Sequence, residues 1–253
     1  MIVGGLFDMK KRLLAYSVKY QGEFNKISEA VWKEEPYEKN IVYKGNYVTL
    51  LDKEYPHQLM PLKYKPWVLF YEGNLSLLKQ EMVTVIGSRK ISENGKRCTN
   101  ELITNLRDNY VIVSGLAKGV DGYAHTMALE KGRNTIAVIG SGIDVHYPKE
   151  NDYLYHRIIR EGLIISEYPF GTRPYAYHFP WRNRILAALG KAVIVVEANK
   201  QSGTMITVNE ALELGKEIYC FPHGYFDSNG TGCNMLIMEG CNIIHDLQQI
   251  KEI

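Results

Sequence analysis

The sequence lacks the long apolar runs, the excess of charge and the leader pattern that mark membrane and exported proteins. No run among its 253 residues reaches the roughly 18 apolar residues of a transmembrane helix. The start, MIVGGLFDMKKRLLAYS, puts its basic residues after a short apolar run, the reverse of the order in a signal peptide. Formal net charge is only +2, so a nucleic-acid-binding face would require locally clustered lysine and arginine. We therefore expect a cytoplasmic protein with no membrane partner.

Cysteine is also scarce, and its spacing does not indicate a metal site. The four cysteines, Cys98, Cys220, Cys233 and Cys241, form no C-x-x-C pair, and the sequence has no H-x-x-x-H. Structural zinc sites usually draw their ligands from such closely spaced pairs. We therefore expect reduced thiols and no bound metal.

Standard nucleotide-binding loops are missing as well. No G-x-G-x-x-G with a later acidic partner is present, and GSRKISENGK (87–96) lacks the GK[ST] ending of a P-loop. We therefore expect no dinucleotide or nucleoside triphosphate cofactor.

What the sequence does contain, from residue 82 onward, is a regular alternation of short apolar runs with helix-length segments. The runs are rich in Val and Ile without polar alternation, which predicts strands buried on both faces of a parallel sheet. The predicted strands are 82–87, 110–115, 135–140, 163–166, 192–198, 217–221 and a short 242–245. The predicted helices are about 92–108, 120–131, 151–161, 180–189, 203–215 and 234–239. This order predicts an α/β, Rossmann-like fold with a doubly wound, mostly parallel sheet.

The first 75 residues have a different texture, rich in Lys, Glu and Tyr. LLAYSVKYQGEFNKISEAVW (13–32) predicts one or two short amphipathic helices, and WVLFYEGN (67–74) predicts a strand and turn. We expect a small N-terminal region at 1–75, with a helical and an extended part, packed on a main domain at 76–253.

Glycines end three of the predicted strands, in Gly87-Ser88-Arg89, Ser114-Gly115 and Gly140-Ser141-Gly142. The carboxyl ends of the strands form the ligand crevice of a doubly wound sheet. Glycine lets the backbone approach a ligand closely, and amides at the following helix N-termini attract anions. A single such glycine is more often only a turn, but three on one edge predict an anion-binding rim.

SGLAKGVDGYAH (114–125) adds a cation and a possible acid–base pair to this rim. Lys118 lies in a glycine-flanked loop with Gly119, where it could meet a phosphate. Asp121 and His125 are spaced i and i+4 on the next helix. Capping of that helix by Asp121 is the favoured interpretation, with orientation of His125 for chemistry as the alternative.

FPWRNRILAALG (179–190) raises a question of charge. Arg182 and Arg184 fall in the first turn of the predicted helix at 180–189, where the helix dipole disfavours cations. Something negative is expected to face them, and a bound phosphate would satisfy both. Phe179 and Trp181 are candidates for stacking on nucleic-acid bases or for packing in the core, and both interpretations stay open.

QSGTMIT (201–207) places Ser202, Gly203 and Thr204 at the start of a further helix, where they could hold an anion or cap the helix.

Taken in order along the chain, these motifs resemble the DNA-processing protein A family, also called DprA or Smf. The resemblance covers about residues 45–246. The motifs that carry it are VIGSR, SGLAKGVDGYAH, TIAVIGSGIDVHYPKEN, SEYP, FPWRNRI, VVEA, SGTMIT and GCNMLIMEGCNII. Members have an extended Rossmann fold, bind single-stranded DNA in natural transformation, protect the incoming strand and help to load the RecA recombinase. They are usually homodimers, and no catalytic activity or cofactor is associated with them.

The resemblance also implies which residues bind DNA and which form the surface between two copies of the chain. The implied DNA- and phosphate-binding residues are Gly87, Ser88, Arg89, Ser114, Gly115, Lys118, Gly119, Phe179, Arg182, Asn183, Arg184, Ser202, Gly203 and Thr204. The implied dimer surface includes Met235, Leu236, Ile237, Met238 and Ile243. Lys118 departs from the family, in which Arg is frequent at this place, and Lys keeps the charge without the fork geometry.

Two other classes of function are kept as alternatives. SGTMITVNE loosely resembles the GGxGTxxE loop of lysine-decarboxylase-like phosphoribohydrolases, which cleave nucleoside monophosphates. In that case Arg89 would hold the phosphate and Glu210 would assist cleavage, although the spacing is longer and the double glycine is missing. A pure protein-interaction scaffold is the third possibility.

Overall fold

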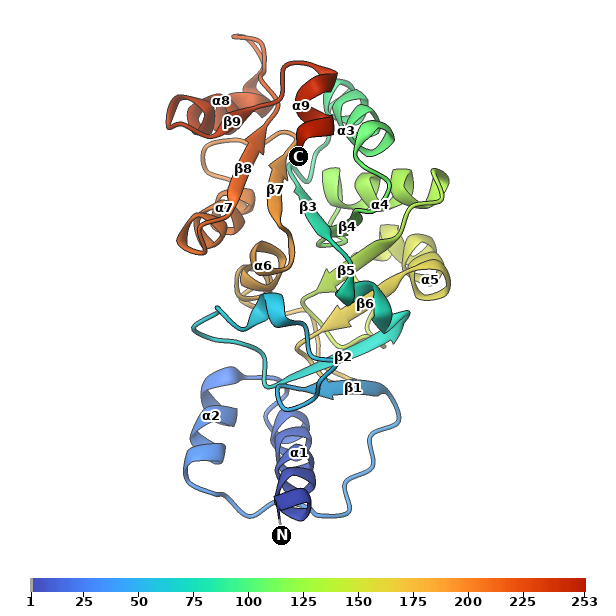
Figure 1. The fold of residues 1–253 in the computed structure, drawn as a ribbon, viewed down its shortest axis with the longest axis vertical. Coiled ribbons are helices and arrows are strands. Elements are labelled where there is room, and N and C mark those ends of the chain that lie inside the picture. Colours follow the sequence, from blue (N-terminus) through green and yellow to red (C-terminus); the bar gives the residue numbers. More distant parts are fainter. Residues whose placement is uncertain (1) are drawn as a thin grey trace.

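The computed structural model describes residues 2–253 and contains one nine-stranded sheet with helices on both faces (Figure 1). The strands are β1 Asn46–Thr49, β2 Val68–Gly73, β3 Met82–Ile86, β4 Val111–Ser114, β5 Thr135–Ile139, β6 Leu163–Ser166, β7 Ala192–Val195, β8 Glu217–Cys220 and β9 Asn242–Ile243. The helices are α1 Ile2–Lys19, α2 Phe24–Trp32, α3 Glu93–Asn105, α4 Val120–Glu130, α5 Asp152–Glu161, α6 His178–Leu189, α7 Gly203–Glu213, α8 Thr231–Met238 and α9 Leu247–Glu252.

The strand order is β1-β2-β6-β5-β4-β3-β7-β8-β9. All neighbours from β6 to β9 run parallel, and β1 and β2 are added antiparallel at one edge. Starting from β3, the chain adds β4, β5 and β6 on one side and then β7, β8 and β9 on the other. The switch in direction therefore lies between β3 and β7. The predicted doubly wound, mostly parallel sheet is confirmed, as is each predicted strand and helix, with ends shifted by a few residues.

Burial follows the apolar pattern of the strands. Every residue of β3, β4, β5, β6 and β7 is buried. One face packs on α3, α4 and α5 through residues such as Leu102, Ala124 and Ile158, and the other face packs on α6 and α7. Strands covered on both sides need apolar residues at successive positions, which explains the unalternating runs.

The N-terminal segment contributes strands to the sheet as well as helices. β2 pairs with β6, from Phe70 opposite Ser166 to Gly73 opposite Leu163, and β1 pairs with β2. The sheet therefore begins before residue 75. The helices α1 and α2 lie beyond β1 at one end of the molecule (Figure 1). Leu13 and Leu14 of α1 belong to the same buried apolar cluster as residues of β2 and α5. The predicted helices and strand of this region are confirmed.

The C-terminal helix α9 was not predicted from the sequence. Its first turn is held by a capping box, in which the Asp246 carboxylate accepts from the Gln248 and Gln249 amides. Ile250 and Ile253 pack into the core beside α3. Within residues 2–253, none of the helices has the length and apolar character required to cross a bilayer.

Candidate functional site

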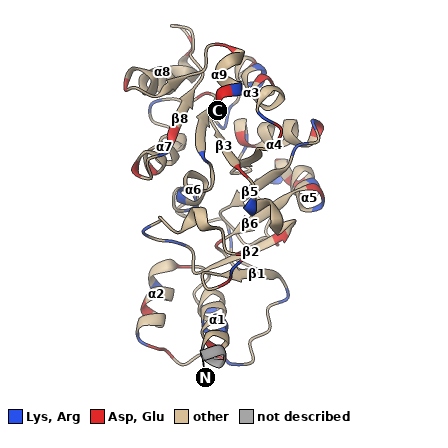
Figure 2. Cartoon of the chain, in the orientation of Figure 1, with Lys and Arg blue, Asp and Glu red and all other residues tan. Residues whose placement is uncertain are grey.

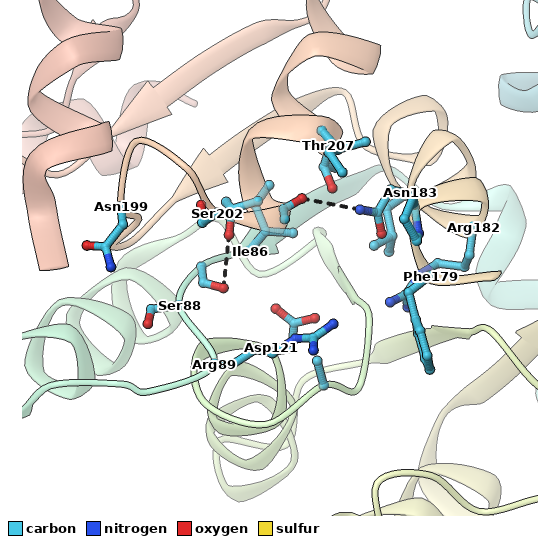
Figure 3. Close-up of a pocket in the computed structure, with 17 residues that line it drawn as sticks. Ile86, Ser88, Arg89, Asp121, Phe179, Arg182, Asn183, Asn199, Ser202 and Thr207 are labelled. Atoms are coloured by element: carbon cyan, nitrogen blue, oxygen red, sulfur yellow. Dashed lines mark hydrogen bonds between the residues drawn. The ribbon is translucent and has the colours of Figure 1, made fainter. Parts of the chain in front are cut away.

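A cavity of about 400 Å³ opens at the carboxyl edge of the sheet, between the ends of β3, β4 and β7. Its walls are Gly87, Ser88 and Arg89 after β3, Ala117 and Asp121 around the start of α4, Phe179, Pro180, Arg182 and Asn183 on α6, and Asn199, Ser202, Gly203, Thr204, Ile206 and Thr207 around the start of α7. Figure 3 shows Arg89 and Asp121 facing Phe179, Arg182 and Asn183 across the open space. A smaller hollow shares Arg89, Phe179 and Arg182 and extends to Lys118, Gly140 and Tyr147.

The loop after β3 is tied down by backbone contacts and by a buried carboxylate. Ser88 donates its amide to the Glu197 carbonyl at 2.8 Å, and its carbonyl accepts from the Val120 amide at 3.0 Å. The fully buried Glu197 carboxylate accepts from the amide and the hydroxyl of Ser92, at 2.8 and 2.6 Å. Gly119 has φ of 77°, and a Cβ there would collide with the Ser88 carbonyl. A glycine at 119 is therefore required for the two loops to lie this close.

Arg89 is the cation that faces the cavity. It is exposed, and no ion pair is found for it within the described range 2–253. Its guanidinium carbon lies 5.9 Å from the ring centroid of Phe179, which is half-buried and lines both hollows. One exposed cation beside one half-buried aromatic ring could supply a phosphate contact and a stacking surface at the same edge.

Arg182 was expected on the rim, and the structure corrects its position. α6 begins at His178, so Arg182 lies beyond the first turn, and its side chain is buried. Nη1 donates to the carbonyls of Gly115, at 2.8 Å, and Val138. Burial lowers the pKa of Arg182 to about 10, and the nearby Asp121 carboxylate opposes that shift. Arg182 lies in the cavity floor and joins α6 to the ends of two strands.

Arg184 does not line the cavity, which corrects its expected role in phosphate binding. Its Nη2 donates to both carboxylate oxygens of Glu167 at 2.7 Å, and both side chains are only 4% exposed. Nε donates to the Tyr64 carbonyl at 2.7 Å, and Nη1 to the Trp181 carbonyl at 2.6 Å. The negative group that faces this arginine is therefore a buried glutamate, and all its donors serve the fold.

Of the two aromatic residues on α6, only Phe179 is placed to meet a ligand in the cavity. Trp181 packs in a separate cluster, with ring centroids 5.4 Å from Tyr64 and 6.2 Å from Phe24. The Arg184 guanidinium lies 4.2 Å from its ring centroid. Trp181 is thus held by other aromatic side chains away from the cavity, although it is only half-buried, and the stacking role of Phe179 stays a prediction.

Lys118 is exposed at the mouth of the smaller hollow, where it forms an ion pair with Glu150. Both side chains are more than half exposed, so this pair adds little to stability and can open when a stronger anion arrives. Lys118 is thus available to a phosphate at a small cost.

The start of α7 supplies polar groups to the opposite wall. Ser202 is the N-cap residue but makes no capping bond, and its buried Oγ has no hydrogen-bond partner among the described residues. Thr204 Oγ1 donates to the Gly87 carbonyl at 3.1 Å, and Asn183 Nδ2 reaches the Gly203 carbonyl at 3.4 Å. Asn183 therefore bonds to the backbone at the start of the facing helix α7. An uncapped helix N-terminus in a cavity attracts anions.

Asp121 and His125 do not form the pair that their spacing suggested. Asp121 makes no capping bond, and its carboxylate flanks Gly115 beside Arg182, where burial raises its pKa. His125 is fully buried, and its Nδ1 lies 2.7 Å from Thr135 Oγ1. Neither the capping role nor an acid–base role of the pair is supported by this geometry.

The buried His125 predicts a specific dependence of stability on pH. Burial lowers its pKa from 6.5 to about 3, so as pH falls through 6.5 the unfolded chain takes up a proton that the folded chain refuses. Stability from this group is complete above pH 6.5 and is lost progressively towards pH 3. Below pH 6 the unfolding free energy of the native protein should therefore fall more steeply than that of His125→Gln, by about 1.4 kcal/mol per pH unit.

Urea unfolding at several pH values measures both slopes. The matched control is His245→Gln, which changes an exposed histidine and should leave the slope as in the native protein. Parallel curves for the native protein and His125→Gln would contradict the assignment.

The structure buries part of the predicted dimer surface and exposes the rest. Leu236 is 2% exposed and packs in the core beside Cys233, so it is not available to a partner. Met235 and Ile237 are half-buried, whereas Met238 is 89% exposed and Ile243 38% exposed. Only the last two present substantial apolar area, and their role in association stays a prediction.

Tyr147 is a wall residue that the sequence reasoning missed. It lines the smaller hollow, and its ring centroid lies 5.4 Å from that of Phe179. It follows Gly140-Ser141-Gly142, the third glycine-rich strand end, and that position was the available signal. Loops after parallel strands meet at the same edge of the sheet, so residues further along this loop belong to the site.

Comparison with known proteins gives the same family as the motifs. The sequence model of the DNA recombination-mediator protein A family matches residues 46–253. The chain is 45% identical over 202 residues to DNA processing protein DprA of Streptococcus pneumoniae, covering 80% of this chain and 72% of that protein.

Two solved structures are also similar. The X-ray structure of the Streptococcus pneumoniae protein superposes with a TM-score of 0.82 at 35% identity, covering 94% of each chain. A structure of DNA processing protein A from Helicobacter pylori, whose subject is its single-stranded DNA binding mode, superposes with a TM-score of 0.74 at 32% identity. It covers 81% of this chain and 94% of that one. On sequence and fold together, the chain belongs to the DNA recombination-mediator protein A family.

Proposed function

We propose that this chain binds single-stranded DNA in the cavity at the carboxyl edge of its sheet and acts in natural transformation. The observation that carries the proposal is the meeting of an exposed Arg89, a half-buried Phe179 and the uncapped start of α7 around one cavity. Membership of the family and the single-stranded DNA binding described for the Helicobacter pylori relative support it.

The side chains around the cavity suit a single DNA strand that is bound through its phosphates and through the flat faces of its bases. Sequence-neutral single-strand binding requires cations along the phosphates and flat rings beneath the bases. Arg89 and Lys118 are the exposed cations at the two hollows, and Phe179 with Tyr147 are the rings nearest to them. The amides at the start of α7 and the unpartnered Ser202 hydroxyl offer donors to a phosphate oxygen.

The buried arginines have another part in this proposal. Arg182 holds the Gly115 and Val138 carbonyls, and Arg184 holds Glu167, so both fix the position of α6 and hence of Phe179 and Asn183. Their replacement would weaken DNA binding through the fold. The direct contacts are assigned to Arg89 and Lys118, with Gly87, Ser88, Gly115, Ser202, Gly203 and Thr204 as backbone and hydroxyl neighbours. Two residues expected to bind do not line either hollow: Ser114 is fully buried and donates its hydroxyl to the Val85 carbonyl at 2.6 Å, and Gly119 serves the close approach of the two loops.

The wider role is proposed from the family resemblance. A strand bound in this way would be protected during uptake and presented to RecA recombinase. We also propose self-association through the exposed Met238 and Ile243, because apolar side chains of this exposure gain by burial against a second copy.

Figure 2 shows Lys and Arg mixed with Asp and Glu on the same helices, for example α3 and α5, so the proposed DNA contact depends on local cations.

The phosphoribohydrolase alternative is not favoured by the geometry. Arg89 lines the cavity, but Glu210 lines a different hollow, formed by residues 61–64, Arg184 and Leu214. The two residues that would hold phosphate and assist cleavage are thus in separate places.

Fluorescence anisotropy with a labelled single strand and its matched duplex tests the proposal. We expect tighter binding of the single strand at both low and moderate salt. Incubation with AMP and CMP, followed by chromatography for free base, should give no release above a blank. Equal or stronger binding of the duplex would overturn the proposed function, and released base would favour the hydrolase.

A further inference from the structure

Three potential metal ligands lie together on the surface where the loop after β5 meets α5. One ligand atom each from His146, Asp152 and His156 lies within 4.8 Å of the others. His146 Nδ1 is 2.5 Å from Asp152 Oδ1, and His156 Nε2 is 3.7 Å from Asp152 Oδ2. None of the three lines the cavity or the smaller hollow. The proposed DNA site therefore does not account for them.

The fold brings these residues together from two elements. Asp152 and His156 are one turn apart on α5, which puts both on the same face of the helix. His146 comes from the loop after β5, and its ring stacks on Tyr155 with centroids 4.1 Å apart and an interplanar angle of 26°. Tyr155 is itself buried and donates its hydroxyl to the Ile143 carbonyl at 2.7 Å. The His146 ring is therefore held on a fixed platform.

We propose that His146, Asp152 and His156 bind one divalent first-row transition metal ion, for which Zn²⁺ serves as the example. Tetrahedral Zn²⁺ with bonds of about 2.0–2.1 Å separates its ligand atoms by roughly 3.3 Å. The present separations of 2.5 Å, 3.7 Å and at most 4.8 Å bracket that value. Small side-chain rotations reach the required geometry, because Asp152 and His156 are more than half exposed.

The donor set selects the class of metal. Two imidazole nitrogens and one carboxylate oxygen suit Zn²⁺, Co²⁺, Ni²⁺ or Cu²⁺, whereas Ca²⁺ and Mg²⁺ take mainly oxygen ligands. Three protein ligands leave a coordination position for water. The sequence-based expectation of no metal depended on C-x-x-C and H-x-x-x-H, and the spacing of His146 to Asp152 to His156 fits neither pattern.

A bound ion would join the loop to the helix. The same loop places Tyr147 in the smaller hollow and leads to Glu150, the partner of Lys118. An ion that binds only the folded chain stabilises it by mass action. The structure thus assigns the ion a clamping position, outside the DNA cavity but on the loop that forms part of its wall.

Titration of the untagged protein with Co²⁺, followed by visible absorption, tests the site, with Zn²⁺ competition against a chromogenic chelator. We expect one ion per chain and at least a tenfold loss of affinity in His156→Ala and in Asp152→Asn. Thermal melts with and without Zn²⁺ should show a rise in Tm for the native protein that both variants lose.

The chain offers a matched control in His245 and Asp246, an exposed pair 3.8 Å apart that is not part of such a group of three ligands in residues 2–253. His245→Ala should bind Co²⁺ and Zn²⁺ as the native protein does. The proposal is overturned if His156→Ala and Asp152→Asn keep native affinity while folded, as judged by circular dichroism. It is also overturned if the Co²⁺ spectrum has thiolate charge-transfer bands, since the ligands would then be cysteines.

Discussion

Replacing Arg184 with methionine is expected to lower the free energy of unfolding by about 3–5 kcal/mol, because it leaves the Glu167 carboxylate buried without its cation. The two side chains are each 4% exposed and are joined by two bonds of 2.7 Å. The same arginine also holds the Tyr64 and Trp181 carbonyls, so three segments lose a shared donor. Urea unfolding monitored by circular dichroism measures the change.

Two further variants make this result specific. Arg160→Met removes an exposed arginine in the last turn of α5 and should change stability by less than about 0.5 kcal/mol. Adding Glu167→Leu to Arg184→Met should recover part of the loss, because no lone buried charge remains. If Arg184→Met were no more destabilising than Arg160→Met, the buried ion pair would not have the structural role described here.

Charge reversal at Arg89 is expected to cause the largest loss of single-strand affinity among substitutions that leave the fold intact. For single strands, each phosphate contact contributes about 0.7 to the slope of log affinity against log salt, or about fivefold at 0.1 M. Arg89→Glu replaces attraction by repulsion, which roughly squares that factor. The affinity for the single strand should therefore fall about 25-fold. Arg89 is exposed and makes no ion pair within the described residues, so the unfolding free energy should hardly change.

Arg160→Glu is the matched control, with the same change in net charge. α5 starts near the carboxyl edge of the sheet and runs back along it, so Arg160, in its last turn, lies away from the cavity. The affinity of Arg160→Glu for the single strand should stay within about twofold of that of the native protein at 0.1 M salt. Equal losses in the two variants would indicate attraction by net charge instead of a site at Arg89.

The architecture was predictable because it depends on patterns that neighbouring residues carry. Apolar runs such as 82–87 and 192–198 have no polar alternation, and only strands covered on both faces tolerate that composition. Glycine-rich strand ends identified the edge where the cavity lies, and Gly119 does have the positive φ that such a loop requires. α9 escaped prediction because its six residues carry too little periodicity to be recognised.

The direction of long side chains was not predictable, because it depends on partners distant in sequence. Arg182 and Arg184 were assigned to a phosphate rim from their place near a helix start, but α6 begins two residues earlier than predicted. Their actual partners are the Gly115 and Val138 carbonyls and the Glu167 carboxylate. Glu167 is part of SEYP in the sequence, but nothing local links it to Arg184. Leu236 was placed on a surface for the same reason, since an apolar run does not reveal which of its residues face inward.

These corrections alter the expected electrostatics of binding. Four converging cations would give a salt slope near three per protomer, at about 0.7 for each contact. With Arg182 and Arg184 committed to the fold, Arg89 and Lys118 together give a slope of about 1.4. Binding at the proposed site should therefore depend less on salt than binding by four converging cations would.

The slope of log affinity against log salt for a single-stranded oligonucleotide, measured for the native protein and for Arg89→Ala, is the most direct test of the proposed site. We predict a slope of about 1.4 per protomer for the native protein and a decrease of about 0.7 in Arg89→Ala. Binding that does not respond to salt, or an identical slope in the two proteins, would contradict a single-stranded DNA site at this cavity.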